Sequence, residues 1–512
     1  MLSLGGYQAT VVILSLSVCQ YQEDCLSTGC WRLLALFWLA FSFNLYYLSH
    51  QMAKYDYDLI VIGGGAGGFV SSKLASGLGK RVAMIEKDKL GGECTLYGCI
   101  PSKTLIRASQ LAREIRNSKR YGLAIEPPPH INTDGVMPHV RSVVQSVYDS
   151  HLPAVFQKLG IDVLFGPPRF VDNHQIELDG KRLSARRFII TTGSSPLIPP
   201  IEGIETIPYL TNETIFSLER LPPSLIVLGG GPIGAELASA FNLLGVDVSL
   251  VHKYDRILNR EDRELVERLS QKLTEDGMNL LTGCQPQKFS IRDGQITLTL
   301  LDAKNQAKEV QAGALLMAIG RKANVEGLSL ENAGIEYTLK GIRTDPTLRT
   351  TAPNIYACGD VVGPYRFSHM AEYQALIAAQ NALFPFKKRV DYRDVAWSVF
   401  TDPEIAHAGL TEEEARAAYG DKIKIYRYEY SNIDRGRTDA AGFGMSKFIC
   451  DPKGMLLGIL ALTACMAINS FIAQSAALPP LPPLATAALP SAGQARPSAA
   501  GCALSRRNAL SC

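Results

Sequence analysis

The sequence predicts an α/β fold with two Rossmann-like units, followed by a smaller α+β domain. Three observations lead to this expectation. The pattern Gly-x-Gly-x-x-Gly occurs twice, each time directly after an apolar run and before a helix-forming stretch. Each copy is followed at the same spacing by a second apolar run that ends in a polar residue. From Val390 onward the pattern changes to short strands, which is typical of an antiparallel sheet.

The first unit begins with a buried strand, Tyr57–Ile62, that runs directly into Gly63-x-Gly65-x-x-Gly68. Glu86 ends the next apolar run, at the position where a carboxylate accepts the ribose hydroxyl groups of a dinucleotide. The N-terminus of the intervening helix receives the pyrophosphate. The glycine pattern alone is weak evidence, but with strand, helix and acid in register it predicts a dinucleotide site.

Cys94 and Cys99 follow this unit after one short segment. Four residues separate them, little more than a helical turn, so their sulfur atoms can come close enough to form a disulfide. A zinc site needs a second ligand pair at matching spacing, and none follows, so no metal site is expected. A buried structural disulfide is the alternative. The motif context, with Lys103 four residues after Cys99 on the same helix face, favours a redox-active pair.

The second unit repeats this order. Leu225–Leu228 leads into Gly229-x-Gly231-x-x-Gly234, which opens a helix that carries Glu236, and a second apolar strand follows. The chain is therefore expected to bind two dinucleotides.

His252 and Lys253 stand in the second unit where the first has Glu86. The spacing from Gly63 to Glu86, counted onward from Gly229, ends at His252. A carboxylate there repels a 2′-phosphate, whereas His and Lys attract one, so NADP(H) is favoured and NAD(H) is the alternative. The other interpretation is that His252 and Lys253 form only a solvated strand end.

At this point the chain resembles the pyridine nucleotide-disulfide oxidoreductases, in the branch that holds mercuric reductase and dihydrolipoamide dehydrogenase. The resemblance extends from about Tyr55 to Ala461. Besides the two glycine fingerprints, it rests on the ordered motifs Gly91-Gly92-Glu93-Cys94 to Lys103, Thr192-Gly193, Ala318-Ile319-Gly320-Arg321, Ala357-Cys358-Gly359-Asp360 and Phe400-Thr401-Asp402-Pro403. The resemblance implies a homodimeric flavoenzyme with an FAD domain, an inserted NAD(P) domain and a C-terminal interface domain.

The resemblance and the composition together divide the chain into segments. These are an N-terminal extension with an apolar stretch (1–52), the first part of the FAD domain (53–195), the NAD(P) domain (196–320), the second part of the FAD domain (321–389), a truncated interface domain (390–461) and a divergent tail rich in Ala and Pro (462–512). Within the first FAD segment we expect a helix over 140–159.

The resemblance also implies roles for single residues. Cys99 is expected to be the charge-transfer thiolate against the flavin, and Cys94 the exposed interchange thiol. Lys103 and Glu236 match the positions that form an ion pair at the reactive nitrogen of the flavin in relatives. The other positions that the resemblance assigns to the cofactors are Thr192, Gly193, Gly320 and Asp360. The alternative for Asp360 is an ordinary turn after Gly359.

These parts predict that NADPH reduces the flavin, that the flavin reduces a Cys94–Cys99 disulfide, and that the dithiol passes electrons to a small disulfide or to Hg(II). A flavin-binding pseudoenzyme or truncated copy without turnover is the alternative. It rests on the C-terminus, where the His-Pro-Thr segment that supplies an acid–base group in relatives does not follow His407. Cys502 and Cys512 are not vicinal, as the terminal pair of mercuric reductase is. We expect a homodimer weakened by this divergent end.

Composition excludes some partners and suggests a location. The net charge is +3, and no basic cluster is interleaved with aromatic residues, so nucleic acid is not an expected partner. Eleven cysteines are too scattered for a disulfide scaffold and suit a reducing cytoplasm. Residues 33–48 form an apolar segment near the lower limit for a membrane span, so a membrane anchor is the alternative. The other interpretation is that residues 1–51 are an upstream extension of the gene model before Met52.

Overall fold

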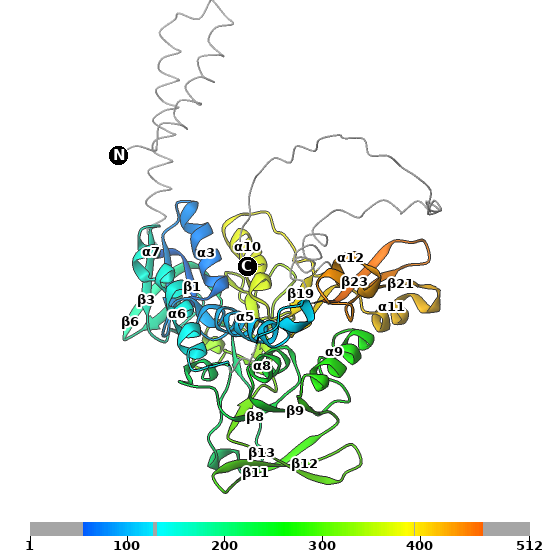
Figure 1. The fold of residues 1–512 in the computed structure, drawn as a ribbon. Helices are drawn as coiled ribbons and strands as arrows, with labels where there is room; N and C mark the ends of the chain where they lie inside the picture. The colour runs from blue at the N-terminus through cyan, green and yellow to red at the C-terminus, as the bar shows by residue number, and fades with distance from the viewer. Residues whose placement is uncertain (1–54, 126–130, 394, 464–512) are drawn as a thin grey trace, which may run out of the picture. The chain divides into compact units, whose positions relative to one another are not determined.

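The structure is a computed structural model, and it describes residues 55–125, 131–393 and 395–463 of the 512-residue chain (Figure 1). The described residues form two compact units. The first takes in the residues up to Pro101, Val140–Leu197 and Arg321–Val390, and the second takes in Ser102–His139, Ile198–Gly320 and the residues from Asp391 onward.

The first unit is built on a sheet of seven strands in which β1 is central. Its parallel strands are β3 (Ile161–Phe165), β2 (Val82–Glu86), β1 (Tyr57–Ile62), β6 (Lys181–Ile190) and β18 (Ile355–Ala357), in that order. The strands β4 (Arg169–Phe170) and β5 (Gln175–Leu178) pair antiparallel with the first half of β6. Because Ile62 pairs with both Ile85 and Ile190, the carboxyl ends of these strands meet at one edge, where open α/β sheets bind ligands.

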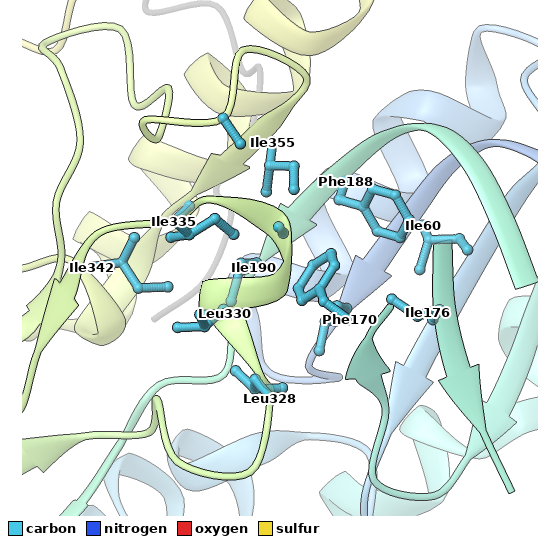
Figure 2. Packing of buried hydrophobic residues seen from close by; sticks show 14 of the residues in the cluster. Ile60, Phe170, Ile176, Phe188, Ile190, Leu328, Leu330, Ile335, Ile342 and Ile355 are labelled. Atoms are coloured by element: carbon cyan, nitrogen blue, oxygen red, sulfur yellow. The ribbon is translucent and has the colours of Figure 1, made fainter. Parts of the chain in front are cut away.

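Alternate side chains of β1 pack on opposite faces of this sheet. Leu59 and Val61 join a core that includes residues of the helices α3 (Ala66–Gly77) and α10 (Ser368–Leu383). Ile60 and Ile62 belong to a second core, which also contains Phe170, Phe188, Leu328, Leu330 and Ile335. Figure 2 shows Ile60 in this core together with Phe170 and Phe188. Both faces of the parallel sheet are therefore buried, which accounts for the unbroken apolar runs in its strands.

The expected helix over 140–159 is wrong in its extent. The structure has α6 (Val136–Tyr148), then the 3₁₀ turn η3 (Asp149–His151) and the short helix α7 (Pro153–Gln157). Pro153 lacks an N–H group and restricts the residue before it to extended backbone. Leu152 accordingly has ψ 148°, and the long helix ends before it.

In the second unit, four parallel strands repeat the plan of the first. Their order is β10 (Asn279–Leu281), β9 (Asp247–Val251), β8 (Ser224–Leu228) and β14 (Ala314–Met317). Between these strands run α8 (Pro232–Leu243), α9 (Arg263–Glu275) and an antiparallel sheet of β11 (Gln285–Arg292), β12 (Gln295–Leu301) and β13 (Ala307–Ala312).

The end of the second unit is an antiparallel sheet of five strands, as the pattern after Val390 predicts. Its order is β19 (Ala396–Val399), β20 (Glu404–Gly409), β23 (Leu456–Thr463), β22 (Met445–Cys450) and β21 (Lys424–Glu429). The helix α11 (Glu412–Tyr419) connects β20 to β21 and begins with a capping box formed by Thr411 and Glu414.

The remaining elements are shorter, apart from α5. They are α4 (Gly92–Leu96), α5 (Cys99–Arg116), α12 (Asp434–Thr438), β7 (Ser194–Pro196), β15 (Arg321–Ala323), β16 (Tyr337–Thr338), β17 (Gly341–Ile342), and the 3₁₀ turns η2 (Ser118–Tyr121), η4 (Ile204–Thr206), η5 (Ile215–Ser217), η6 (Leu330–Ala333), η7 (Gly359–Val361), η8 (Gly420–Lys422) and η9 (Tyr430–Asn432).

Among the helices in the described part of the chain, none is long and apolar enough to cross a membrane. The apolar segment 33–48 and the tail from residue 464 lie outside the described residues.

Candidate redox site and nucleotide sites

The first glycine loop joins β1 to α3 in a conformation that requires glycine. Gly63 has φ +111°, and its N–H donates to Ile85 O at 2.7 Å. A Cβ on Gly68 would lie 1.9 Å from Gly63 O, so only glycine lets α3 approach the loop this closely. The N–H of Gly64 donates to Glu86 Oε2 at 2.8 Å. The Glu86 carboxylate, at the end of β2, therefore fixes the backbone of the glycine loop that leads into α3.

The second glycine loop has the same geometry between β8 and α8. Gly229 has φ +119°, and a Cβ on Gly234 would lie 1.8 Å from Gly229 O. The N–H of Gly230 donates to His252 Nδ1 at 2.9 Å. His252 thus occupies the structural position that Glu86 has in the first unit.

The structure corrects the charge that the sequence assigned to His252. Its side chain is buried, with an exposed fraction of 8%. Desolvation and then the neighbouring Lys253 hold the pKa of His252 below its usual value, so the ring is neutral near pH 7. Because Nδ1 accepts the Gly230 N–H, the proton lies on Nε2. That buried nitrogen has no hydrogen-bond partner among the described residues. The positive charge at this strand end comes from the exposed Lys253.

Cys94 and Cys99 lie on two successive helices in the first unit. Cys94 is in α4, and Cys99 is the first residue of α5. Both side chains are partly exposed. Gly98 makes the tight turn between the helices, because a Cβ there would lie 3.0 Å from Glu93 O. Cys99 Sγ lies 3.3 Å from Ser368 Oγ at the start of α10.

The cysteine segment packs directly on the first glycine loop. Gly91 N–H donates to Gly64 O at 2.8 Å. Gly92 has φ +57°, and a Cβ on it would lie 2.7 Å from Gly65 Cα. No side chain fits between the two backbones at this point. Gly92 therefore has to be a glycine for the segment that carries Cys94 to lie against the dinucleotide loop.

A hydrogen-bonded network connects the cysteine helix to Asp360. Arg321 pairs with Glu93, the neighbour of Cys94, and its Nε donates to Ser194 Oγ at 2.7 Å. Ser194 Oγ in turn donates to Asp360 Oδ2 at 2.6 Å. The sequence motifs contained Glu93 and Arg321, but nothing in their spacing indicated that they pair.

Thr192 and Gly193 directly precede β7, which pairs antiparallel with β15 in the first unit. Thr192 Oγ1 donates to Asn324 O at 2.7 Å, and Asn324 N–H donates to Gly193 O at 3.0 Å. Gly193 has φ +72° and Gly320 has φ +148°. Gly193 and Gly320 have no side chain, so any contact that either makes with a cofactor comes from main-chain groups.

Lys103 and Glu236 form an ion pair within the second unit. Lys103 Nζ donates to Glu236 Oε2 at 3.0 Å, and Phe400 N–H donates to Glu236 Oε1 at 3.0 Å. Lys103 lies on α5, four residues after Cys99. The sequence motif contained Phe400 but gave no sign that its backbone holds Glu236.

His369 and His407 differ in their surroundings. His407 is buried, with Nδ1 2.7 Å from Glu261 Oε2 and Nε2 2.9 Å from Gly409 O. Both ring nitrogens of His407 therefore have structural partners. His369 directly follows Ser368 in α10 and stacks on Phe367. Among the described residues, no three His, Cys, Asp or Glu side chains group closely enough to hold a metal ion.

Together, these features define a flavoprotein-type fold with two dinucleotide loops and a cysteine pair whose segment packs against the first of these loops. The family model described as "Pyridine nucleotide-disulphide oxidoreductase" matches residues 57–381, and that of its dimerisation domain matches residues 395–477. The chain belongs to this family of FAD-dependent oxidoreductases that use a nicotinamide nucleotide.

Individual relatives support this placement. The mercuric reductase of Staphylococcus aureus is 35% identical over 399 residues, which cover 78% of this chain and 72% of that protein. The mercuric reductase of Bacillus cereus is 33% identical over 401 residues, and the match spans 63% of its length. The dihydrolipoyl dehydrogenase of Bacillus subtilis is 31% identical over 430 residues, covering 82% of this chain and 91% of that protein.

A solved structure has the same fold. The HOCl-induced flavoprotein disulfide reductase RclA from Escherichia coli superposes with a TM-score of 0.73 at 29% identity, and the match covers 82% of this chain and 93% of that one.

Proposed function

We propose that this protein is an NADPH-dependent flavin disulfide reductase that passes electrons through FAD to Cys94 and Cys99, and from them to a small disulfide or to Hg(II). One observation carries the proposal. The cysteine segment is in backbone contact with the first glycine loop, at Gly91 and Gly92, so the thiols lie beside the loop that binds a dinucleotide.

The residues of the first unit fit FAD. The amide groups at the start of α3 and the carboxylate of Glu86 would hold its pyrophosphate and ribose, and Asp360 would hold the region between pyrophosphate and ring. When bound, FAD supplies a ring that accepts two electrons from a nicotinamide and delivers them to a disulfide. Lys103 would supply the positive charge that stabilises reduced flavin and thiolate, and Glu236 would orient that charge.

The residues of the second unit fit a nicotinamide nucleotide. A Cβ on Gly231 would meet no atom within 4 Å, so the loop leaves open space at the start of α8. The buried Nε2–H of His252, which has no hydrogen-bond partner within the described part of the chain, would be a donor for a ribose oxygen. We favour NADPH because Lys253 adds a positive charge beside this donor.

The two cysteines have different tasks in the proposed exchange. The Cys94 thiolate attacks one sulfur of the acceptor disulfide, which forms a mixed disulfide and releases the first acceptor thiol. The Cys99 thiolate then attacks Cys94 Sγ, which closes the Cys94–Cys99 disulfide and releases the second thiol. The positive end of α5, whose first residue is Cys99, favours the thiolate form that this step needs. NADPH supplies the two electrons that reopen the disulfide.

The same proposal extends to assembly and location. The match to a dimerisation domain supports a homodimer, which the molar mass from light scattering tests. A dithiol that must be kept reduced between turnovers suits the cytoplasm. Recovery of the native protein from membranes after a high-salt wash would instead support the anchor alternative.

The test uses the purified full chain and two single variants. We expect bound FAD, reduction by NADPH, and a long-wavelength charge-transfer band in the reduced enzyme. Cys99→Ser removes the band, because that thiolate lies against the flavin in relatives, and Cys94→Ser keeps it. A band that persists in both variants would show that the roles are wrong. Flavin reduction without turnover of glutathione disulfide, lipoamide or Hg(II) would favour the pseudoenzyme alternative.

A further inference from the structure

Phe400 contacts both members of the Lys103–Glu236 pair. It lies in the loop after β19, and its backbone N–H donates to Glu236 Oε1 at 3.0 Å. Its ring faces the Lys103 ammonium group, with Nζ 4.1 Å from the ring centroid. Glu236 Oε2 accepts from the same ammonium at 3.0 Å. The ammonium therefore contacts both a carboxylate and an aromatic ring.

We propose that Phe400 is the positioning residue of Lys103, fixing the ammonium group through its ring and the partner carboxylate through its N–H. The inference deepens the proposed function, on which it rests, because it names what keeps the positive charge of Lys103 in place.

The exposure of the two side chains explains why Lys103 needs a second contact besides Glu236. The side chain of Lys103 is 37% exposed, whereas that of Glu236 is 10% exposed. A partly exposed lysine has many rotamers, and water competes with the carboxylate for its ammonium group. One ion pair alone therefore orders it weakly. An ammonium over an aromatic face is attracted to it, most strongly where water is excluded. The ring thus adds an attraction to that of the Glu236 carboxylate.

The loop that carries Phe400 is anchored independently of Lys103. Asp402 Oδ1 lies 2.7 Å from Arg113 Nη1, and these side chains are only 4% and 12% exposed. The Asp402 N–H donates to Ser239 Oγ at 3.3 Å. Arg113 lies on α5, as Lys103 does, and Ser239 lies on α8, as Glu236 does. The loop is thus bonded to α5 and α8, the two helices that carry Lys103 and Glu236.

The first experiment does not depend on flavin. Reductive methylation of Lys103 is followed by mass spectrometry in the full chain, in Phe400→Leu and in Phe400→Tyr, with the exposed Lys304 as the reference lysine in each sample. Phe400→Leu keeps the backbone N–H and an apolar side chain but removes the aromatic face. We expect Lys103 to react about three- to tenfold faster in Phe400→Leu, the loss of a cation–π contact expressed as a rate ratio. Phe400→Tyr keeps the wild-type rate.

The second experiment measures flavin reduction by NADPH in the same three proteins by stopped flow. Phe400→Leu should lower the limiting rate by a similar factor and leave the NADPH concentration at half-saturation unchanged, because the ring acts on Lys103 and not on nucleotide binding. Phe400→Tyr should restore the limiting rate, which a general packing defect would not do.

The outcomes separate this inference from the function on which it rests. Wild-type Lys103 reactivity in Phe400→Leu, or equal acceleration in Phe400→Tyr, overturns the positioning role whatever the flavin does. A wild-type chain that binds no flavin refutes the proposed function, while faster methylation in Phe400→Leu alone would still establish the contact.

Discussion

His252 is the residue at which the two nucleotide loops differ most in chemistry. Glu86 offers its loop a charged acceptor, whereas His252 offers a neutral ring whose Nδ1 accepts and whose Nε2 donates. A neutral donor discriminates weakly between a ribose hydroxyl and a phosphate. In the proposed function, selection between the two nucleotides therefore falls to the charge of Lys253.

Lys253→Ala should lower kcat/KM for NADPH about tenfold and leave the value for NADH within about twofold. The lost contact is a hydrogen bond between a charged donor and a phosphate, worth about 1.5–3 kcal/mol, reduced here by solvent exposure. Steady-state rates with both nucleotides measure the ratio, and Lys304→Ala in the same unit is the matched control. An unchanged ratio would refute the assignment of NADPH.

The buried His252 also predicts how stability depends on pH. Its pKa is lower in the folded chain than the ordinary value of 6.5. The unfolded chain therefore binds a proton near pH 6.5 that the folded chain does not, so this group lowers stability as the pH falls below about 6.5. His252→Gln should show a shallower loss of unfolding free energy between pH 7.5 and 5.5, measured by urea denaturation. Equal slopes in the two proteins would contradict burial of a neutral ring.

At the scale of elements, the glycines of one loop separate packing from ligand binding. Gly234 and Gly231 are three residues apart. An added Cβ meets Gly229 O at 1.8 Å in the first case and nothing within 4 Å in the second. Gly231 has φ −76°, which alanine adopts without strain.

Gly231→Ala should therefore fold normally, with an unfolding free energy within about 0.5 kcal/mol of wild type, the cost of alanine at an N-cap. Its affinity for NADPH should fall more than about tenfold, because the new methyl group occupies the space of the pyrophosphate. Gly234→Ala should lose stability by several kcal/mol, since α8 must move away from the loop. Urea denaturation and fluorescence titration with NADPH distinguish the two. Tight NADPH binding by Gly231→Ala would place the nucleotide elsewhere.

Sequence predicts these elements well where the constraint is local. The bounds of β1 agree with the expected strand Tyr57–Ile62, because a strand buried on both faces is a continuous apolar run. Sequence does not predict the backbone at Leu258. The N–H of Leu258 donates to Gly230 O in the second unit, as the N–H of Gly91 donates to Gly64 O in the first. Leu258 has φ +46°, a left-handed backbone conformation that is rare for leucine and that its residue type therefore does not predict.

The candidate site was predictable to the extent that its motifs are contiguous. Cys94, Cys99 and Lys103 share one short segment, and the placement of Lys103 four residues after Cys99 follows from helical spacing. The partners Phe400, Asp402 and Ser194 come from distant segments, and only tertiary packing brings them to Glu236, Arg113 and Asp360. The segment assignments, the roles of the cysteines and the choice of nucleotide stay predictions.

At the scale of the whole molecule, the proposed reaction divides into two halves that use different residues. Delivery of electrons from NADPH to the flavin needs both glycine loops and the Lys103–Glu236 pair. Transfer to the acceptor needs the thiol of Cys94. A variant of one set should therefore leave the other half intact, since Cys94 lies on α4 and Lys103 on α5.

Cys94→Ser should keep NADPH-dependent flavin reduction within about twofold of wild type and lose disulfide turnover by more than about 10³-fold, because serine is not a nucleophile toward disulfides at neutral pH. Glu236→Gln should slow flavin reduction about ten- to a hundredfold, since Lys103 then lacks its charged partner. It should retain the thiol reactivity of Cys94 toward iodoacetamide in the chemically reduced enzyme. Stopped-flow reduction, steady-state turnover and alkylation on the same preparations measure all three quantities. Loss of flavin reduction in Cys94→Ser would show that the halves are not separable and that the thiol takes part in the first.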